Sequence, residues 1–223
     1  MIDLPTVLHT PPRWWTPRFD VPEGITVIDL AEDPLAAAGR LSAQARSVLP
    51  GIPDDQVSHL VESQRAVVDA LRAGGVYWAG SCVARSGADP GCLTVAHLAA
   101  SLVETGTVDT DLAAAVAELN GSAGAASRQY PGAGDSDRVA DVIQLPAGPA
   151  MLVISEQVIH PVRTTIGTPD GTARRIRQVL VALPVPGAAR LAVLTLATEH
   201  LADWTAYLDL MARIARSLGF SSD

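Results

Sequence analysis

The chain contains no lysine, and all sixteen of its basic residues are arginine. This absence excludes the phosphate-loop lysine of nucleotide-binding proteins, the Schiff base of pyridoxal-phosphate enzymes and a lysine general base. A GC-rich genome, which favours arginine and alanine codons, explains the bias. Any chemistry must therefore come from other residue types.

Long apolar runs and positive charge are also scarce. No apolar run reaches the roughly 18 residues that span a bilayer. The N-terminal segment lacks the basic start and apolar stretch of a secretory signal. A net charge of -8 disfavours binding to nucleic acid or to an anionic membrane. We therefore expect a cytoplasmic protein with no membrane span and no nucleic-acid partner.

Only two cysteines are present, Cys82 and Cys92, on either side of a predicted hairpin turn. If Arg85 pairs with Cys92, Cys82 pairs with Val95. The two sulfurs then lie on opposite faces of the sheet and cannot form a disulfide. This pattern predicts two reduced thiols.

Motifs for catalysis and cofactor binding are missing. The five histidines have no metal-ligand spacing, and no GxSxG elbow or complete dinucleotide motif occurs. We predict no catalytic residue, no metal and no cofactor, which favours a non-enzymatic protein. One alternative stays open, because the expected pairing puts His97 on the Cys82 face: a small-ligand binder or Cys/His-dependent enzyme with a pocket near both. A hydrogen-bonded core or cavity histidine is the preferred interpretation of His97.

Strand patterns dominate residues 139–197, where apolar runs of strand length end in Pro/Gly turns. Short links make such neighbours antiparallel. Helical spacing is found near residues 34–49, 54–72 and 198–218. The strand at residues 92–105 is apolar on both faces, which indicates helices on both. The prediction is an α+β fold: a mostly antiparallel sheet in an α/β/α sandwich, forming one domain over residues 19–223 after an extended arm, residues 1–18.

Two features are candidates for binding a protein partner. Trp14 and Trp15 are costly to leave in water, so the arm folds back on its own domain or docks on a partner subunit. Four arginines gather around a predicted hairpin and form either a solvated sheet edge or a docking surface for an acidic partner or small anion. These are Arg163, Arg174, Arg175 and Arg177.

The start FDVPEGITVIDL, the central run of strands and the ending EHLADWTAYLDLMARIARSLGF resemble small actinobacterial proteins of the Mog1/PsbP-like kind. The resemblance implies an antiparallel sheet between helices and a non-catalytic binding or assembly role, and it assigns no functional residue. The leading hypothesis is a non-enzymatic cytoplasmic protein-binding or assembly module, and self-association is one form that such binding can take. A secretion-system accessory role is a further alternative that the resemblance suggests.

Overall fold

The structure, a computed structural model, describes residues 15–73, 76–106, 111–116, 138–159 and 174–222. Its elements are, in chain order, β1 (Trp15–Arg18), β2 (Ile25–Val27), α1 (Pro34–Val48), α2 (Asp54–Ala73), β3 (Val76–Arg85), β4 (Leu93–Glu104), β5 (Arg138–Leu145), β6 (Gly148–Ile159), β7 (Arg174–Pro184), β8 (Arg190–Thr198), the 3-10 turn η1 (Leu201–Asp203), α4 (Trp204–Ser217) and β9 (Gly219–Ser222). None of these helices is long and apolar enough to cross a membrane within the described residues.

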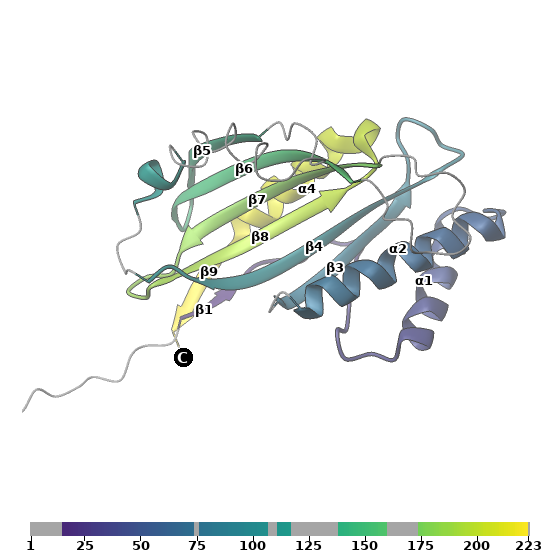
Figure 1. Ribbon diagram of the computed structural model, residues 1–223, viewed down its shortest axis with the longest axis horizontal. Helices are drawn as coiled ribbons and strands as arrows, with labels where there is room; N and C mark the ends of the chain where they lie inside the picture. Colours follow the sequence, from purple (N-terminus) through teal and green to yellow (C-terminus); the bar gives the residue numbers. More distant parts are fainter. Residues whose placement is uncertain (1–14, 74–75, 107–110, 117–137, 160–173, 223) are drawn as a thin grey trace, which may run out of the picture.

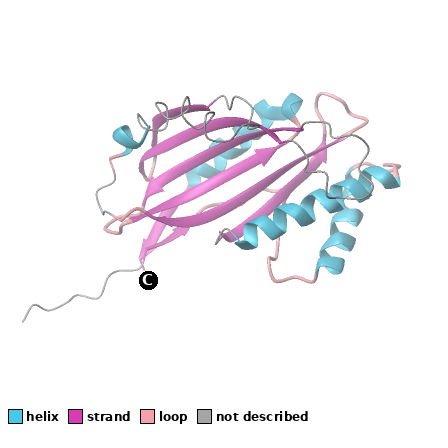
Figure 2. Ribbon diagram, viewed as in Figure 1, coloured by secondary structure: helices cyan, strands magenta, loops and turns pink. Residues whose placement is uncertain are grey.

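A seven-stranded antiparallel sheet is the body of the molecule (Figure 2). The strands lie in the order β2-β3-β4-β8-β7-β6-β5, so each neighbouring pair is antiparallel. The central pairing of β4 with β8 brings together segments about a hundred residues apart, as His97 lies opposite Ala197. The sheet therefore depends on contacts that no local turn specifies.

One face of the sheet packs on α4. Alternate residues of the central strands point to this face, including Leu98, Val181 and Leu196, each no more than 3% exposed. They meet Met211 and Ile214 of α4, which are also buried. Alternation along a strand and a stripe along a helix thus bury one common core.

The opposite face is only partly covered, and the predicted α/β/α sandwich is wrong. The helices α1 and α2 cross at one end of this face, next to β3 and β4 (Figure 1). There they bury Val83, Leu93 and Val95. Farther along β4 on this face, no described helix packs on the strand, and Val103 is 44% exposed. An apolar pattern on both faces of one strand therefore did not require a complete second helical layer.

The start of α1 follows its sequence signals. Asp33 caps the helix, because its Oδ1 accepts hydrogen bonds from the backbone N–H groups of Leu35 and Ala36 at 2.9 and 3.1 Å. Pro34 takes the first helical position, where its missing N–H has no partner to lose. An Asp-Pro pair directly before a helical pattern is the sequence signal for such a start, so this cap could be predicted from adjacent residues alone.

A second, two-stranded sheet joins the two ends of the described chain. Trp15 lies opposite Ser222, and Arg18 lies opposite Gly219, in antiparallel pairing of β1 with β9. The last four residues of the predicted arm are therefore tied to the domain through this strand. Trp14 lies outside the described residues, and the side chain of Trp15 is not described.

Candidate functional site

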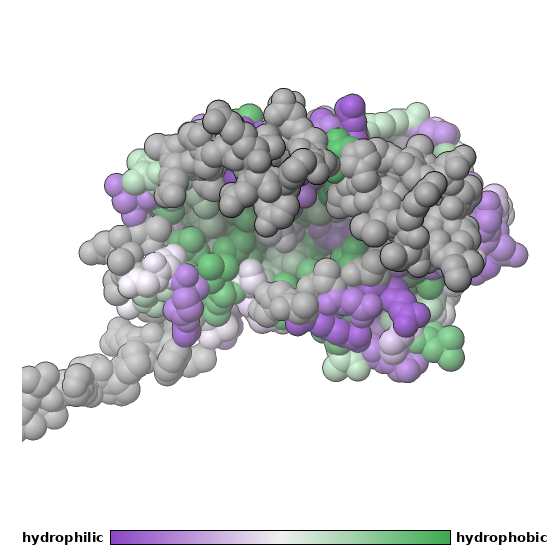
Figure 3. Space-filling model, in the orientation of Figure 1, coloured by the Kyte–Doolittle hydropathy of each residue, from purple (hydrophilic) through white to green (hydrophobic). Residues whose placement is uncertain are grey.

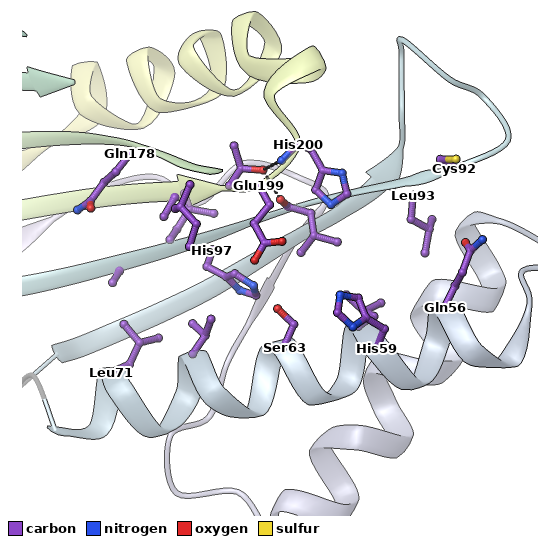
Figure 4. Close-up of a pocket in the computed structure, with 18 of the residues that line it drawn as sticks. Gln56, His59, Ser63, Leu71, Cys92, Leu93, His97, Gln178, Glu199 and His200 are labelled. Carbon is purple, nitrogen blue, oxygen red and sulfur yellow. Dashed lines mark hydrogen bonds between the residues drawn. The ribbon is translucent and has the colours of Figure 1, made fainter. Parts of the chain in front are cut away.

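A cavity of about 760 Å³ opens between α2 and the part of the sheet that the helices leave uncovered. Figure 3 shows the hollow, with hydrophobic residues in its floor and hydrophilic residues along α2. The close-up in Figure 4 shows side chains from α2, from β4 and from the segment after β8 pointing into this space. The cavity is thus built from segments that are distant in the sequence.

The floor consists of one row of paired positions across three strands. His97 of β4 lies opposite Ala197 of β8, which lies opposite Gln178 of β7. Residues directly opposite each other in an antiparallel pair share a face, so all three point to the same side. Ala99 and Thr195 form the next paired row on this face. Small and polar side chains here leave room that larger apolar residues would fill.

The wall opposite the floor is one face of α2. His59, Ser63, Val67 and Leu71 line the cavity at spacings of four residues, which puts them in a single row along the helix. His59 is exposed, whereas the other three are half-buried. The wall therefore becomes apolar toward the C-terminal end of the helix.

The third side is the segment that leaves β8. The hydroxyl of Thr198 donates to the backbone carbonyl of Val95 at 2.6 Å and accepts from the backbone N–H of His200 at 3.0 Å. These two bonds fix the turn against β4, with Thr198 only 3% exposed. Glu199 and His200 project from this turn beside the cavity (Figure 4).

His97 is a half-buried polar residue on the floor of the cavity. Loss of hydration lowers the pKa of its imidazole from 6.5 to about 4, and repulsion from His200 adds to the effect. The ring is therefore neutral at physiological pH. Its Nδ1 is sealed from solvent and has no hydrogen-bond partner. A buried polar atom without a partner costs about 1–3 kcal/mol, and a bound molecule could supply the missing bond.

No arginine lines the cavity among the described residues, and the chain has no lysine. The acidic side chains in the described part of its rim are those of Asp55 and Glu199. Burial lowers the pKa of His200, while Glu199 and Asp203 act in the opposite direction. The part of the lining that the structure describes therefore contains no arginine guanidinium.

The predicted sharing of one face by Cys82 and His97 is wrong. The hairpin pairs Arg85 with Leu93, which puts Ser81 opposite His97 and Cys82 opposite Ala96. This register differs by one residue from the predicted one, and such a shift moves a side chain to the other face. Cys82 packs into the core under α4, and burial raises the pKa of its thiol. The pocket near His97 is lined by Cys92 and not by Cys82.

The predicted arginine cluster is only partly described, because Arg163 lies outside the described residues and the side chain of Arg174 is not described. The guanidinium of Arg177 already has partners within the protein. Its Nε and Nη2 donate hydrogen bonds to Glu156 at 3.0 and 2.5 Å. The same group lies 5.4 Å from the ring centre of Trp204, in a cation–π contact. A hairpin around the turn at residues 168–171 would place Arg163 opposite Ile176, but Gln157 lies opposite Ile176 in the structure.

Arg175 lies on the same strand and is more available. Its side chain is 67% exposed, and its Nη1 lies 3.5 Å from Glu156. Docking of an acidic partner by this group of arginines stays a prediction. Of the described guanidinium groups at this site, that of Arg175 is the more accessible to a partner.

No group of three or more His, Cys, Asp or Glu side chains within the described ranges could hold a metal ion. The histidines that surround the cavity come from three different elements and do not form such a group. We therefore interpret His59, His97 and His200 as polar lining.

No protein-family model matches the chain, and no curated protein matches it. A solved structure of LpqN, which is involved in cell envelope biogenesis of Mycobacterium tuberculosis, is similar, with 16% sequence identity and a TM-score of 0.40. The match covers 96% of this chain and 87% of that chain. A likeness at this level supports no statement about function, which has to be inferred from the cavity.

Proposed function

We propose that the protein binds a small apolar molecule in the cavity between α2 and the sheet. The observation that carries this proposal is a hollow of about 760 Å³ whose described lining is mostly apolar, with the half-buried imidazole of His97 on its floor. Cavities of roughly 300–1,000 Å³ with a few convergent polar groups are typical of ligand sites. The role that we propose is binding, because no hydrogen bond joins Ser63 or Cys92 to a histidine in the described lining.

The apolar surface of the cavity gives the driving force. Half-buried side chains such as Val67, Leu71 and Ile176 would lose contact with water when a ligand fills the space. Each Å² of apolar surface removed from water contributes about 25 cal/mol. A ligand of modest size therefore gains affinity from contact with the lining, and His97 orients it.

A fluorescence titration tests this function. N-phenyl-1-naphthylamine, a neutral dye that brightens in apolar surroundings, should bind the wild-type protein saturably at one site. Ala197→Phe puts a phenyl ring on the cavity floor and should abolish the saturable signal. Ala202→Phe is the matched control, because Ala202 is exposed and does not line the cavity. Equal dye binding by both variants, or no saturable binding by the wild type, contradicts the proposal.

Self-association is a second candidate, favoured by the strand at one end of the sheet. Among the described strands β5 pairs only with β6, and its Val139 and Val142 are 67% and 39% exposed. An edge strand with exposed apolar side chains can pair with another chain. This geometry supports the protein-binding role that the sequence suggested.

Light scattering over a range of protein concentrations tests the second candidate. The wild type should form a dimer as concentration rises, and Val139→Glu should weaken it by adding charge to the edge. Leu35→Glu is the control, since Leu35 is 82% exposed on α1. A wild type that stays monomeric throughout, or a dimer that Val139→Glu leaves intact, removes this candidate.

A further inference from the structure

We propose that α2 is a wall shared by two cavities that compete for space, so that filling the second cavity weakens ligand binding in the first. This inference rests on the proposed binding function and states how that function is regulated. Three observations carry it: the second cavity, the two faces of α2 and the distribution of packing along this helix.

The second cavity lies between α1, α2 and the segment that leads into α1, and its volume is about 360 Å³. Ala37 and Ala38 line it from α1, and Val61 and Val68 line it from α2. The two alanine side chains are half-buried and leave space that a larger residue would fill. Protein interiors are normally close-packed, so a hollow of this size gives the neighbouring helix room to move.

The two cavities lie against different faces of α2. The first is lined by Ser63, Val67 and Leu71, and the second by Arg65, Val68 and Arg72. At about 100° of rotation per residue, these two rows lie roughly 130° apart around the helix axis. A shift of α2 away from the sheet therefore enlarges the first cavity and narrows the second.

The second half of α2 is the part that can shift. In the first half, Val57 and Leu60 are 4% and 9% exposed and pack into the cluster that also contains Leu41 of α1. In the second half, Val67 and Val68 are only half-buried, one beside each cavity. A segment with fewer buried apolar contacts costs less free energy to displace. A ligand that needs more room would therefore displace this half of the helix.

Arg72 limits the direction of the movement. Its Nε and Nη2 donate hydrogen bonds to the backbone carbonyls of Leu30 and Glu32 at 2.6 and 3.2 Å. Both carbonyls belong to the segment that leads into α1, beside the second cavity. The long arginine side chain can keep these bonds while α2 moves toward that segment, whereas they break if the helix moves farther away. The movement that remains open is the one that narrows the second cavity.

Dye titration of a variant with a filled second cavity tests the proposal. Ala38→Phe should weaken binding of N-phenyl-1-naphthylamine about tenfold, because α2 can then move aside only by overpacking. Ala43→Phe is the control and should bind as the wild type does, since Ala43 is exposed on α1 and lines neither cavity. If Ala38→Phe does not fold, Ala38→Leu should show a smaller effect in the same direction. Wild-type affinity in a folded variant at position 38 overturns the proposal and leaves the binding function in place.

A distance measurement follows the helix with the second cavity unfilled. Spin labels at two exposed positions, Gly39→Cys and Arg65→Cys, report the separation of α1 and α2 in a protein that also carries Cys82→Ala and Cys92→Ser. Saturation with the dye should shorten this separation by about 1–2 Å, a shift typical of packed helices. An unchanged distance on saturation overturns the proposal. Absence of saturable dye binding by the wild type overturns the proposed function together with the inference.

Discussion

The hydroxyl oxygens of Thr94 and Tyr207 lie 2.7 Å apart, and their hydrogen bond joins β4 to α4 inside the core. Both residues are 4% exposed. Burial raises the pKa of Tyr207, so its phenol stays neutral at any physiological pH. The helix that covers one face of the sheet is thus held at a fixed position by a polar contact as well as by apolar packing.

Tyr207→Phe should lower the free energy of unfolding by about 1 kcal/mol, because the hydroxyl of Thr94 loses its partner at a buried position. Thr94→Val should have an effect of similar size. The double variant should cost less than the sum of the two, since both single changes remove the same bond. Denaturant unfolding of the four proteins measures this coupling, and strictly additive effects would show that the bond contributes nothing.

Gly80 lies beneath the ring of Trp78, which meets Phe19 edge-on at a centroid distance of 4.9 Å. A Cβ at position 80 would lie 2.8 Å from both Cγ2 of Ile25 and Cη2 of Trp78. Gly80→Ala should therefore destabilise the protein by roughly 1–3 kcal/mol through overpacking. Gly39→Ala, where a Cβ meets nothing within 4 Å, is the control. Thermal unfolding in which both variants behave alike would contradict this account.

His97 should make stability depend on pH in the acidic range. Its pKa falls from 6.5 to about 4 on folding, so between these values the unfolded chain binds a proton that the folded chain excludes. Stability from this group is complete above pH 6.5 and is lost as pH falls toward 4, by roughly 3 kcal/mol in total. His97→Gln should lose less stability than the wild type over this interval. Parallel curves from urea unfolding at each pH would contradict the prediction.

Cys92 and Cys82 should differ in thiol reactivity. Cys92 is exposed, but its Sγ lies 3.2 Å from Oδ2 of Asp89, which raises the pKa of the thiol. Asp89→Asn should lower that pKa and speed labelling by a thiol reagent at neutral pH, because more thiolate is present. Cys92→Ser should leave only the slow reaction of the half-buried Cys82. A fast second thiol in that variant, or no change with Asp89→Asn, would count against this environment.

The features that could be predicted from the sequence are those set by residues adjacent in the chain. The cap at Asp33 and Pro34 depends only on adjacent residues, and the turn after Leu145 is closed by the local pairing of that residue with Gly148. In each case the signal and the structure that it specifies lie within a few residues. Such features need no knowledge of the rest of the chain.

The register of the hairpin between β3 and β4 could not be predicted from adjacent residues. Ser86 N–H donates to the carbonyl of Cys92, so Leu93, one residue farther along, lies opposite Arg85. The turn residues alone allow either pairing. The packing of Val83, Leu93 and Val95 against α1 and α2 favours the observed one. Because that packing is not local, the sequence pattern could not reveal it.

The cavity could be anticipated only from scattered signs. A histidine in an apolar strand, together with Gln178 and Thr195 in two others, marks polar positions on one face. Their proximity depends on β4 lying beside β8 and β8 beside β7, which no spacing reveals. The resemblance to Mog1/PsbP-like proteins stays a prediction, since it rested on apolar spacing, whereas the layered fold that it implied is wrong.

The pairing of β1 with β9 has a mechanical consequence. Trp15 and Ser222 form the outermost pair, and the strands run inward from there to Arg18 and Gly219. A force that pulls the two ends of the chain apart would open these pairs one after another, as a zipper opens, instead of shearing them all at once. The small sheet would therefore yield first under tension, before load reaches the seven-stranded sheet.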